Sequence, residues 1–377
     1  MRILFAAPAY WPAVAFGGPI PVARELANGL AARGHDVEVV TTSLVDARRG
    51  RSVRSRHEDV EGARVRYLAT PLAYRWMGFT PSLPMVLRRL RPDVVHVFGY
   101  RDPLGTTVAA WCRRAKRPYV FEPLGMFVPR FRKVRTKRVF DRLWRAAPEG
   151  ANLIVATSEL ERNELAAAGL PAERIVVRPN GFPAPTNTTA ADGLRARLGL
   201  GATDPLVLFV GRLNRKKGLD ILLRALAGLS QATLAIVGPD DHDGTRTTVE
   251  RLRDELGLRE RVHLVGATSN PFALYAEADV LAMPSRNENF GNVAAEAAAA
   301  GTPAVISDQC GVAEFVRDRA ALVVGVSEGD VRDALAKVLE DDALRNRLAA
   351  EGPRVAEELS WPNVCAMQEE IYERAIA

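Results

Sequence analysis

The chain has 377 residues, of which 47% are hydrophobic and 25% are charged, and its formal net charge is +6. This composition is typical of a globular protein, the length allows two domains with separate cores, and no apolar run reaches the roughly 18 residues of a membrane-spanning helix. The positive charge suits phosphate-bearing ligands, anionic lipid or nucleic acid. Cys112, Cys310 and Cys365 form no CxxC pair and are odd in number, so we expect neither a disulfide framework nor a structural zinc site, and a cytoplasmic location fits best.

The N-terminal part of the chain predicts a Rossmann-like βαβ unit. An apolar strand at Arg2–Ala7 is followed by apolar residues at helical spacing over 20–30 and by a second strand at Val37–Thr41. The unit lacks the GxGxxG fingerprint, so a nicotinamide or flavin cofactor is not supported. Gly17 and Gly18 stand where the loop enters the helix, and they suit either a plain turn or close approach of the backbone to a ligand.

Two polar residues in the following strands are candidates for contact with an acceptor or a sugar. His96 lies inside the apolar strand DVVHVFG (93–99), and Glu122 ends the strand Pro118–Glu122. A lone histidine in a buried strand is more often a satisfied core residue than a catalytic one. His96 nevertheless approaches the carboxyl end of its strand, and Glu122 ends its own, where open parallel sheets bind ligands.

The segment Arg130–Arg145 holds eight basic residues and one acidic residue, interleaved with aromatic and aliphatic side chains. This pattern is similar to that of an interfacial helix on anionic lipid, and a solvated surface helix is the alternative. No helix-turn-helix, zinc finger or RNA-binding sheet signature accompanies it, so we expect no nucleic acid partner. The protein is therefore expected in the cytoplasm, with a possible peripheral association at the inner membrane face.

Beyond a Pro-, Thr- and Ala-rich stretch, Pro183–Ala191, which is the candidate interdomain linker, the alternation of strands and helices restarts. An apolar strand, Leu206–Val210, leads into GRLNRKKGLD (211–220), which carries four basic residues, and then into a helix. Glycine at a strand end, clustered cations and the N-terminus of a helix suit a diphosphate, and a solvated basic loop is the alternative. The segment does not match the Walker pattern GxxxxGK[ST].

The segment MPSRNENFGNVAAEAAAAGTPAVIS (283–307) predicts a strand end, a polar loop, a helix at Asn292–Ala300 and another strand. The loop follows a strand and therefore lies where a parallel sheet holds its ligand. Glu288 in the loop and Glu296 in the helix are candidate functional carboxylates, and the amides of Gly291 to Val293 can face an anion. An ordinary helix cap and a solvated glutamate are the alternatives.

A run of acidic residues with one histidine, Asp240 to Asp243, is the remaining candidate for metal binding. No second cluster of ligands accompanies it at a characteristic spacing. We therefore interpret it as a solvated turn and expect no metal ion.

Taken together, these motifs resemble family-four retaining glycosyltransferases of the GT-B fold over essentially the whole chain. The resemblance is carried by Gly17-Gly18-Pro19, the DVVHVFG strand, Arg178–Gly181, GRLNRKKGLD, and above all ENFGNVAAE (288–296), whose two glutamates match the family's Glu-x7-Glu pattern. The resemblance implies two Rossmann-like doubly wound domains. They are an acceptor-binding domain, 1–185 with 360–377, and a nucleotide-sugar-binding domain, 186–359.

The resemblance also implies roles for individual residues. Arg212 and Lys217 would neutralise the diphosphate of a UDP- or GDP-type sugar, Glu288 would hold the sugar hydroxyls, and Glu296 would hold the ribose. No cofactor or metal is implied beyond this co-substrate, and the catalytic group would be Glu288, Arg212 and Lys217. The implied donor contacts are Gly17, Gly18, Arg212, Lys217, Glu288, Phe290, Gly291, Asn292, Val293 and Glu296.

Two positions depart from the family pattern. Leu124 stands where many relatives carry a histidine, and Asn289 stands where glycine is common. The implied reaction is transfer to a lipid-linked or saccharide acceptor in glycan or glycolipid biosynthesis. An epimerase-like enzyme that processes a sugar nucleotide without transfer, and an inactive sugar-nucleotide-binding module, are the alternatives.

Overall fold

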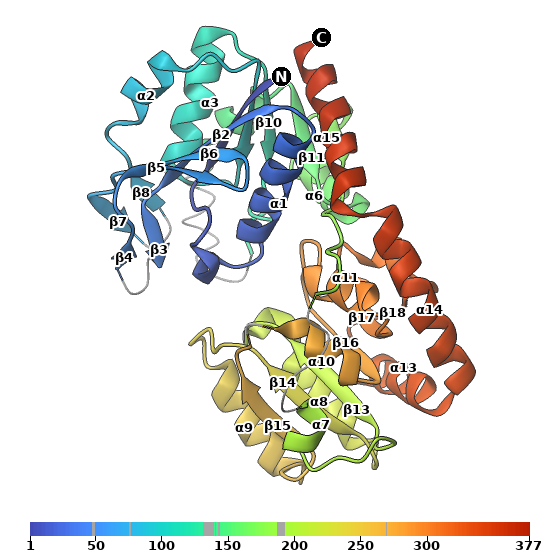
Figure 1. The fold of residues 1–377 in the computed structure, drawn as a ribbon. Helices are drawn as coiled ribbons and strands as arrows, with labels where there is room; N and C mark the ends of the chain where they lie inside the picture. Colours follow the sequence, from blue (N-terminus) through green and yellow to red (C-terminus); the bar gives the residue numbers. More distant parts are fainter. Residues whose placement is uncertain are drawn as a thin grey trace. The chain divides into compact units, whose positions relative to one another are not determined.

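The computed structural model describes residues 1–46, 50–74, 77–130, 139, 141, 144–186, 193–268 and 270–377. The chain forms two compact units, Met1–Gly181 with Trp361–Ala377, and Phe182–Ser360. Each unit has its own mainly parallel sheet covered by helices, which confirms the predicted pair of Rossmann-like folds (Figure 1). The second unit begins at Phe182, earlier than the expected 186, because the Phe182 N–H donates to the Leu359 oxygen at 2.8 Å and Phe182 pairs with Ser360.

Two segments singled out in the sequence lie mostly outside the described residues. The candidate linker Pro183–Ala191 is described only up to residue 186, and in the basic segment Arg130–Arg145 residues 131–138, 140 and 142–143 are not described. The roles expected for both segments therefore stay predictions.

The first unit is built around one large sheet, two short hairpins and the helices that cover them. Its elements in chain order are β1 (Arg2–Ala7), η1 (Val14–Phe16), α1 (Pro19–Ala32), β2 (Asp36–Thr42), β3 (Leu44–Asp46), β4 (Arg51–Ser52), β5 (Arg56–Val60), β6 (Ala63–Leu68), β7 (Leu72–Tyr74), β8 (Met77–Phe79), α2 (Leu83–Arg89), β9 (Val94–Phe98), α3 (Pro103–Ala115), β10 (Tyr119–Glu122), α5 (Ala146–Glu149), β11 (Leu153–Ala156), α6 (Glu159–Ala167), η2 (Ala172–Arg174), β12 (Ile175–Val177) and α15 (Trp361–Ile376).

The large sheet has the strand order β12-β11-β10-β9-β1-β2-β6-β5. Its neighbouring strands are parallel, except that β5 pairs antiparallel with β6 at one edge. The chain builds outward from β1 through β2 on one side and through β9 on the other. The strand order therefore reverses between β1 and β9, and in sheets of this kind ligands bind at the carboxyl ends beside such a switch point.

Both faces of this sheet are buried, because successive side chains of each strand point to opposite faces. Ile3 of β1 packs in a cluster with Leu26 of α1 and Tyr372 of α15, whereas Leu4 packs in a second cluster with Val108 of α3. The helices α1 and α15 lie side by side on the first of these faces (Figure 1). The C-terminal helix is thus part of the core of the N-terminal unit.

The second unit has one fully parallel sheet in the order β15-β14-β13-β16-β17-β18. The strand order reverses between β13 and β16, which places the switch point of this unit at their carboxyl ends. Its elements in chain order are α7 (Leu194–Arg197), β13 (Leu206–Val210), η3 (Arg215–Lys217), α8 (Leu219–Ala227), β14 (Thr233–Val237), α9 (Thr245–Glu255), β15 (Val262–Gly266), α10 (Pro271–Glu277), β16 (Val280–Met283), α11 (Asn292–Ala299), β17 (Ala304–Ser307), α12 (Ala313–Val316), β18 (Ala321–Val324), α13 (Glu328–Glu340) and α14 (Asp342–Glu358).

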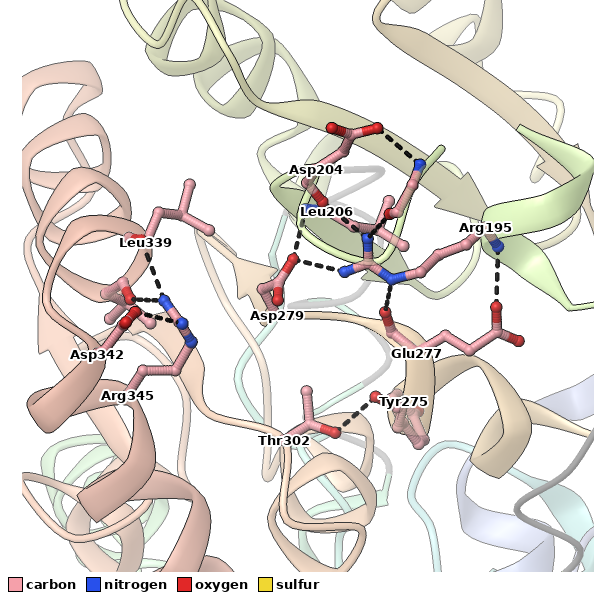
Figure 2. A network of polar contacts seen from close by, with 12 residues as sticks. Arg195, Asp204, Leu206, Tyr275, Glu277, Asp279, Thr302, Leu339, Asp342 and Arg345 are labelled. Atoms are coloured by element: carbon pink, nitrogen blue, oxygen red, sulfur yellow. Dashed lines mark hydrogen bonds and ion pairs between the residues drawn. The ribbon is translucent and has the colours of Figure 1, made fainter. Parts of the chain in front are cut away.

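The amino ends of β13 and β16 are joined through Arg195 (Figure 2). Its guanidinium donates to Asp279 at 2.7 Å and to the backbone oxygen of Glu277 at 2.8 Å, and the Leu206 N–H donates to the same Asp279 oxygen at 2.7 Å. Each of these hydrogen bonds has a charged donor or a charged acceptor, and such bonds are stronger than those between neutral groups. The two strands are thereby held together at the end opposite to the loops described next.

Candidate active site

The candidate site of the second unit is built from the two loops that follow β13 and β16. These strands pair in parallel, with Val207 opposite Val280 and Leu208 opposite Leu281. The loop 211–218 leaves β13 and the loop 284–291 leaves β16, so both begin at the switch point of the sheet.

The first loop is held against the end of β14 by backbone contacts. Gly211, with φ +148°, donates its N–H to Val237 at 2.9 Å, and a Cβ added at Gly238 would lie 1.9 Å from the Gly211 oxygen. Only glycine allows these two backbone segments to approach this closely. The loop therefore begins against the carboxyl end of β14. The Arg212 side chain is 45% exposed, and its guanidinium lies 3.7 Å from Asp241.

The two loops also contact each other. Gly218 has φ +68°, and a Cβ added there would lie 2.1 Å from the Pro284 oxygen. The Arg286 N–H donates to the Lys216 oxygen at 2.7 Å, and the Arg286 guanidinium forms two hydrogen bonds of 2.7 Å with Asp220. The Arg286 guanidinium lowers the pKa of Asp220, and the hydrogen bond with Asp220 raises the pKa of Arg286. These contacts fix the position of Lys217, which lies between Lys216 and Gly218.

Lys217 and Glu288 meet where the loops join. The Lys217 ammonium donates to Glu288 Oε2, and the two side chains are 14% and 24% exposed. Glu288 is held in place by its backbone, because its N–H donates to the Gln309 oxygen at 2.9 Å and its oxygen accepts from Gly311 at 3.2 Å. A cation and an anion thus form a pair that is reachable from solvent at the carboxyl ends of β13 and β16.

The helix α11 begins beside this pair. Gly291 has φ +109°, so the backbone turns sharply before Asn292, and a Cβ added there would lie 3.0 Å from Met283 Cε. Gly291 has no side chain to cap the helix, and the first N–H groups of any helix lack an intrahelical acceptor. The start of α11 therefore carries the partial positive charge of the helix dipole close to Lys217 and Glu288.

The side chain of Phe290 does not belong to the site. It is 2% exposed and packs against Phe315 and Phe182, with ring centroids 6.0 Å and 6.3 Å away. The Phe290 backbone oxygen accepts from the Val312 N–H at 2.7 Å. The Phe290 ring anchors the loop in the core of the unit.

Glu296, in the second turn of α11, has a different partner from Glu288. The Tyr275 hydroxyl donates to Glu296 Oε2 at 2.7 Å. Burial raises the pKa of Glu296, against the effect of the tyrosine hydrogen bond, and burial and the Glu296 charge raise the pKa of Tyr275. Sequence analysis did not identify Tyr275, Asp220 or Arg286, because no motif spacing relates them to their partners.

In the first unit, His96 and Glu122 belong to a buried ionic cluster. Neither side chain has exposed surface. His96 Nδ1 lies 2.7 Å from the Tyr372 hydroxyl, and His96 Nε2 lies 3.1 Å from the Glu122 carboxylate. The Arg178 guanidinium donates to the same carboxylate at 2.6 Å. Burial lowers the pKa of His96, whereas the Arg178 charge keeps that of Glu122 low despite burial. This burial favours the interpretation of His96 as a core residue, and contact of His96 or Glu122 with an acceptor or a sugar stays a prediction.

The other candidates of the sequence lie as follows. Gly17 has φ +93° and Gly18 directly precedes α1, as expected for a loop that enters a helix. The His242 N–H donates to Asp240 at 2.9 Å within a turn. Within the described part of the chain, no group of three or more His, Cys, Asp or Glu side chains is arranged to hold a metal ion.

Two Rossmann-like units, one of which carries clustered cations and a helix N-terminus at its switch point, define the GT-B class. The family model "Glycosyl transferase 4-like domain" matches residues 17–181, and "Glycosyl transferases group 1" matches residues 192–355. The two models together cover most of the chain, which therefore belongs to the GT4-type glycosyltransferases of the GT-B class.

The chain is also similar to individual members of this class. It is 35% identical to a D-inositol 3-phosphate glycosyltransferase of Xylanimonas cellulosilytica over 59% of the chain and 57% of that protein, and 29% identical to that of Thermomonospora curvata over 92% and 88%. Matches to two further proteins of this name cover 49% and 55% of their length, so the chain spans about half the length of the first curated relatives it matches.

Two solved structures superimpose on this chain over nearly its whole length. Sucrose-phosphate synthase from Thermosynechococcus elongatus superimposes with a TM-score of 0.78 and 25% identity, covering 99% of this chain and 98% of that one. Anabaena HepE in complex with UDP and glucose superimposes with a TM-score of 0.75 and 22% identity, covering 98% of each chain. The second likeness concerns the fold alone.

Proposed function

We propose that the protein transfers a glycosyl group from a nucleoside diphosphate sugar to a hydroxyl group of an acceptor. The observation that carries this proposal is the ion pair of Lys217 and Glu288 at the switch point of the second unit, beside the start of α11. A cation, a carboxylate and a helix N-terminus in one place suit a ligand that combines phosphate groups with sugar hydroxyls.

In this proposal the donor separates the ion pair. The diphosphate replaces Glu288 as the partner of Lys217, and the exposed Arg212 adds a second positive charge. Glu288 is then free to accept hydrogen bonds from the sugar hydroxyls. Glu296 accepts from the ribose, next to the Tyr275 hydroxyl that holds its carboxylate. Gly17 and Gly18 as donor contacts stay a prediction.

The same groups account for catalysis of sugar transfer. Negative charge grows on the leaving diphosphate, and preorganised cations and backbone amides stabilise such charge in the transition state. Two side-chain cations and a helix N-terminus supply this stabilisation, so we propose that the reaction proceeds without a metal ion. We further propose a same-face displacement with retention, in which a leaving phosphate oxygen accepts the acceptor proton and Glu288 only orients the sugar.

The nucleotide base of the donor and the chemical class of the acceptor are also proposals. The HepE structure contains UDP, which together with the family favours a UDP-type donor, and a GDP-type donor is the alternative. We propose a lipid-linked or saccharide acceptor in glycan biosynthesis. Association of Arg130–Arg145 with the inner membrane face stays a prediction; no helix of the described residues is long and apolar enough to span a bilayer.

The proposal is tested by measuring release of nucleoside diphosphate from UDP-, GDP-, ADP- and TDP-glucose, with and without lipid-linked and saccharide acceptors. We expect acceptor-dependent release with one donor base, and a loss of about 100-fold in Glu288→Ala, because the sugar loses its orienting carboxylate. Glu260→Ala, which removes an exposed glutamate of the same unit, should behave as the wild type. Conversion of the donor into its epimer, with no net release of nucleoside diphosphate, would favour the epimerase-like alternative, and nucleotide binding without turnover would favour the inactive module.

A further inference from the structure

The first unit contains a cavity of about 160 Å³ at its own switch point. It lies where β1, β9 and β10 end and α1 begins, and its walls include Ala7, Phe16, Ile20, Phe98, Leu124 and Met126. Every residue of its lining is apolar or glycine, and none carries a charge.

The cavity is a pocket that opens to solvent, because Phe16, Leu124 and Met126 of its wall are partly exposed, and its position favours a ligand site. A ligand site is expected at the switch point of an open α/β sheet, and a large apolar pocket there is the natural candidate. The wall is also rigid, because the Phe98 ring stacks on the buried His96 ring at 4.0 Å and an angle of 15°.

Leu124 shows that the chain tolerates strain at this wall. The turn Pro123–Met126, closed by a 3.0 Å hydrogen bond, places Leu124 at φ +52°, a conformation that residues other than glycine, asparagine and aspartate rarely adopt. The turn is held from behind by Glu161, which accepts from the Gly125 N–H at 2.7 Å. Strained residues persist where the surrounding structure enforces them, and they cluster at ligand sites.

The lining determines which ligand chemistry fits. A sugar or a phosphate in this cavity would lose its hydrogen bonds to water, and no lining side chain carries a charge or a strong hydrogen-bonding group to replace them. An apolar group gains from the same burial. The volume is on the order of that needed for one aromatic ring or a short branched alkyl chain.

We propose that this cavity binds an apolar part of the acceptor, so that the lipid-linked or saccharide acceptor carries an aryl or alkyl group and is not a bare polyol phosphate. This inference rests on the proposed function, since it assigns the acceptor of that reaction. The proposed acceptor differs from the inositol phosphate in the name of the D-inositol 3-phosphate glycosyltransferases to which the chain is similar.

The test is calorimetric titration of the full chain with phenol and, separately, with D-inositol 3-phosphate. Leu124→Asn keeps a residue that accepts positive φ but makes the wall polar, and Leu72→Asn is the matched control, because Leu72 is 69% exposed on β7. We expect phenol to bind the wild type and Leu72→Asn equally, and Leu124→Asn at least tenfold more weakly. A thermal melt of each variant verifies folding, and Leu124→Gly, which also relieves the strain, should lose affinity in the same direction.

Each outcome bears on the proposal separately from the proposed function. Failure of phenol to bind the wild type, equal affinity in Leu124→Asn, or binding of D-inositol 3-phosphate that phenol displaces overturns the inference. If phenol binds as expected while no nucleoside diphosphate binds, the cavity assignment to an apolar ligand holds and the transfer function fails. If nucleotides bind and phenol does not, the function stands and the acceptor class is wrong.

Discussion

The contact between the two loops of the candidate site makes a specific prediction for Gly218. Gly218 and Gly199 have the same φ of +68°, but a Cβ at Gly218 would lie 2.1 Å from the Pro284 oxygen, whereas nothing lies within 4 Å of one at Gly199. Alanine at either position has a left-handed backbone, which costs about 1–2 kcal/mol. Only at Gly218 must the neighbouring loop also move, since ordinary carbon–oxygen contacts are about 3.3 Å or longer.

The difference between the two variants isolates the loop contact. Overpacking of this kind costs about 1–3 kcal/mol, so we expect Gly199→Ala to lose about 1–2 kcal/mol of unfolding free energy and Gly218→Ala about 2–5 kcal/mol. Urea denaturation followed by circular dichroism measures both losses. Gly218→Ala should also weaken nucleotide binding, because the displaced turn carries Lys217. Equal losses in the two variants would refute the close approach of the loops.

Three further predictions concern individual side chains. Burial raises the pKa of Glu161 to about 7, whereas in the unfolded state the carboxyl loses its proton near 4.5. The unfolding free energy of the wild type is therefore higher at acid pH. It falls by up to about 3 kcal/mol as the pH rises through about 7. The unfolding free energy of Glu161→Gln relative to the wild type should therefore rise between pH 5 and 8, and parallel curves would contradict this. Tyr275→Phe should cost about 1–3 kcal/mol in urea denaturation, because Glu296 loses its donor; an unchanged midpoint would contradict it. Asp220→Asn should change stability by less than about 1 kcal/mol, since its pair with Arg286 is partly exposed, yet raise the donor KM; unchanged KM would exclude a positioning role.

The sequence predicts the elements of this fold well, because apolar runs are bounded by glycine and proline. The strands at Arg2–Ala7 and Leu206–Val210 have the predicted bounds. The helix predicted at Asn292–Ala300 ends at Ala299, which is the usual uncertainty at helix ends. The motifs also placed both site loops at strand ends, since each follows a short apolar run.

The contacts within the site were not predictable in the same way. Lys217 and Glu288 are separated by 71 residues, and they meet only because β13 and β16 are neighbours in the sheet without being consecutive in the chain. Spacing also does not distinguish a buried side chain from an exposed one at a strand or loop end. Phe290 and His96 stand at positions that suit ligand contact, yet both side chains are in the core.

Binding of a nucleoside diphosphate to the cations of the second unit is the step on which the proposed function depends. The direct measurement is a thermal-shift titration of the wild type with UDP, GDP, ADP and TDP, beside the double variants Arg212→Ala/Lys217→Ala and Arg224→Ala/Lys337→Ala. The second double variant removes the same charge from exposed positions on α8 and α13. A nucleotide at about 100 times its Kd should add about 2.7 kcal/mol to the wild type and to the α8/α13 variant, and little to the site variant. Equal stabilisation of all three proteins, or stabilisation of none, would contradict the assignment of this site.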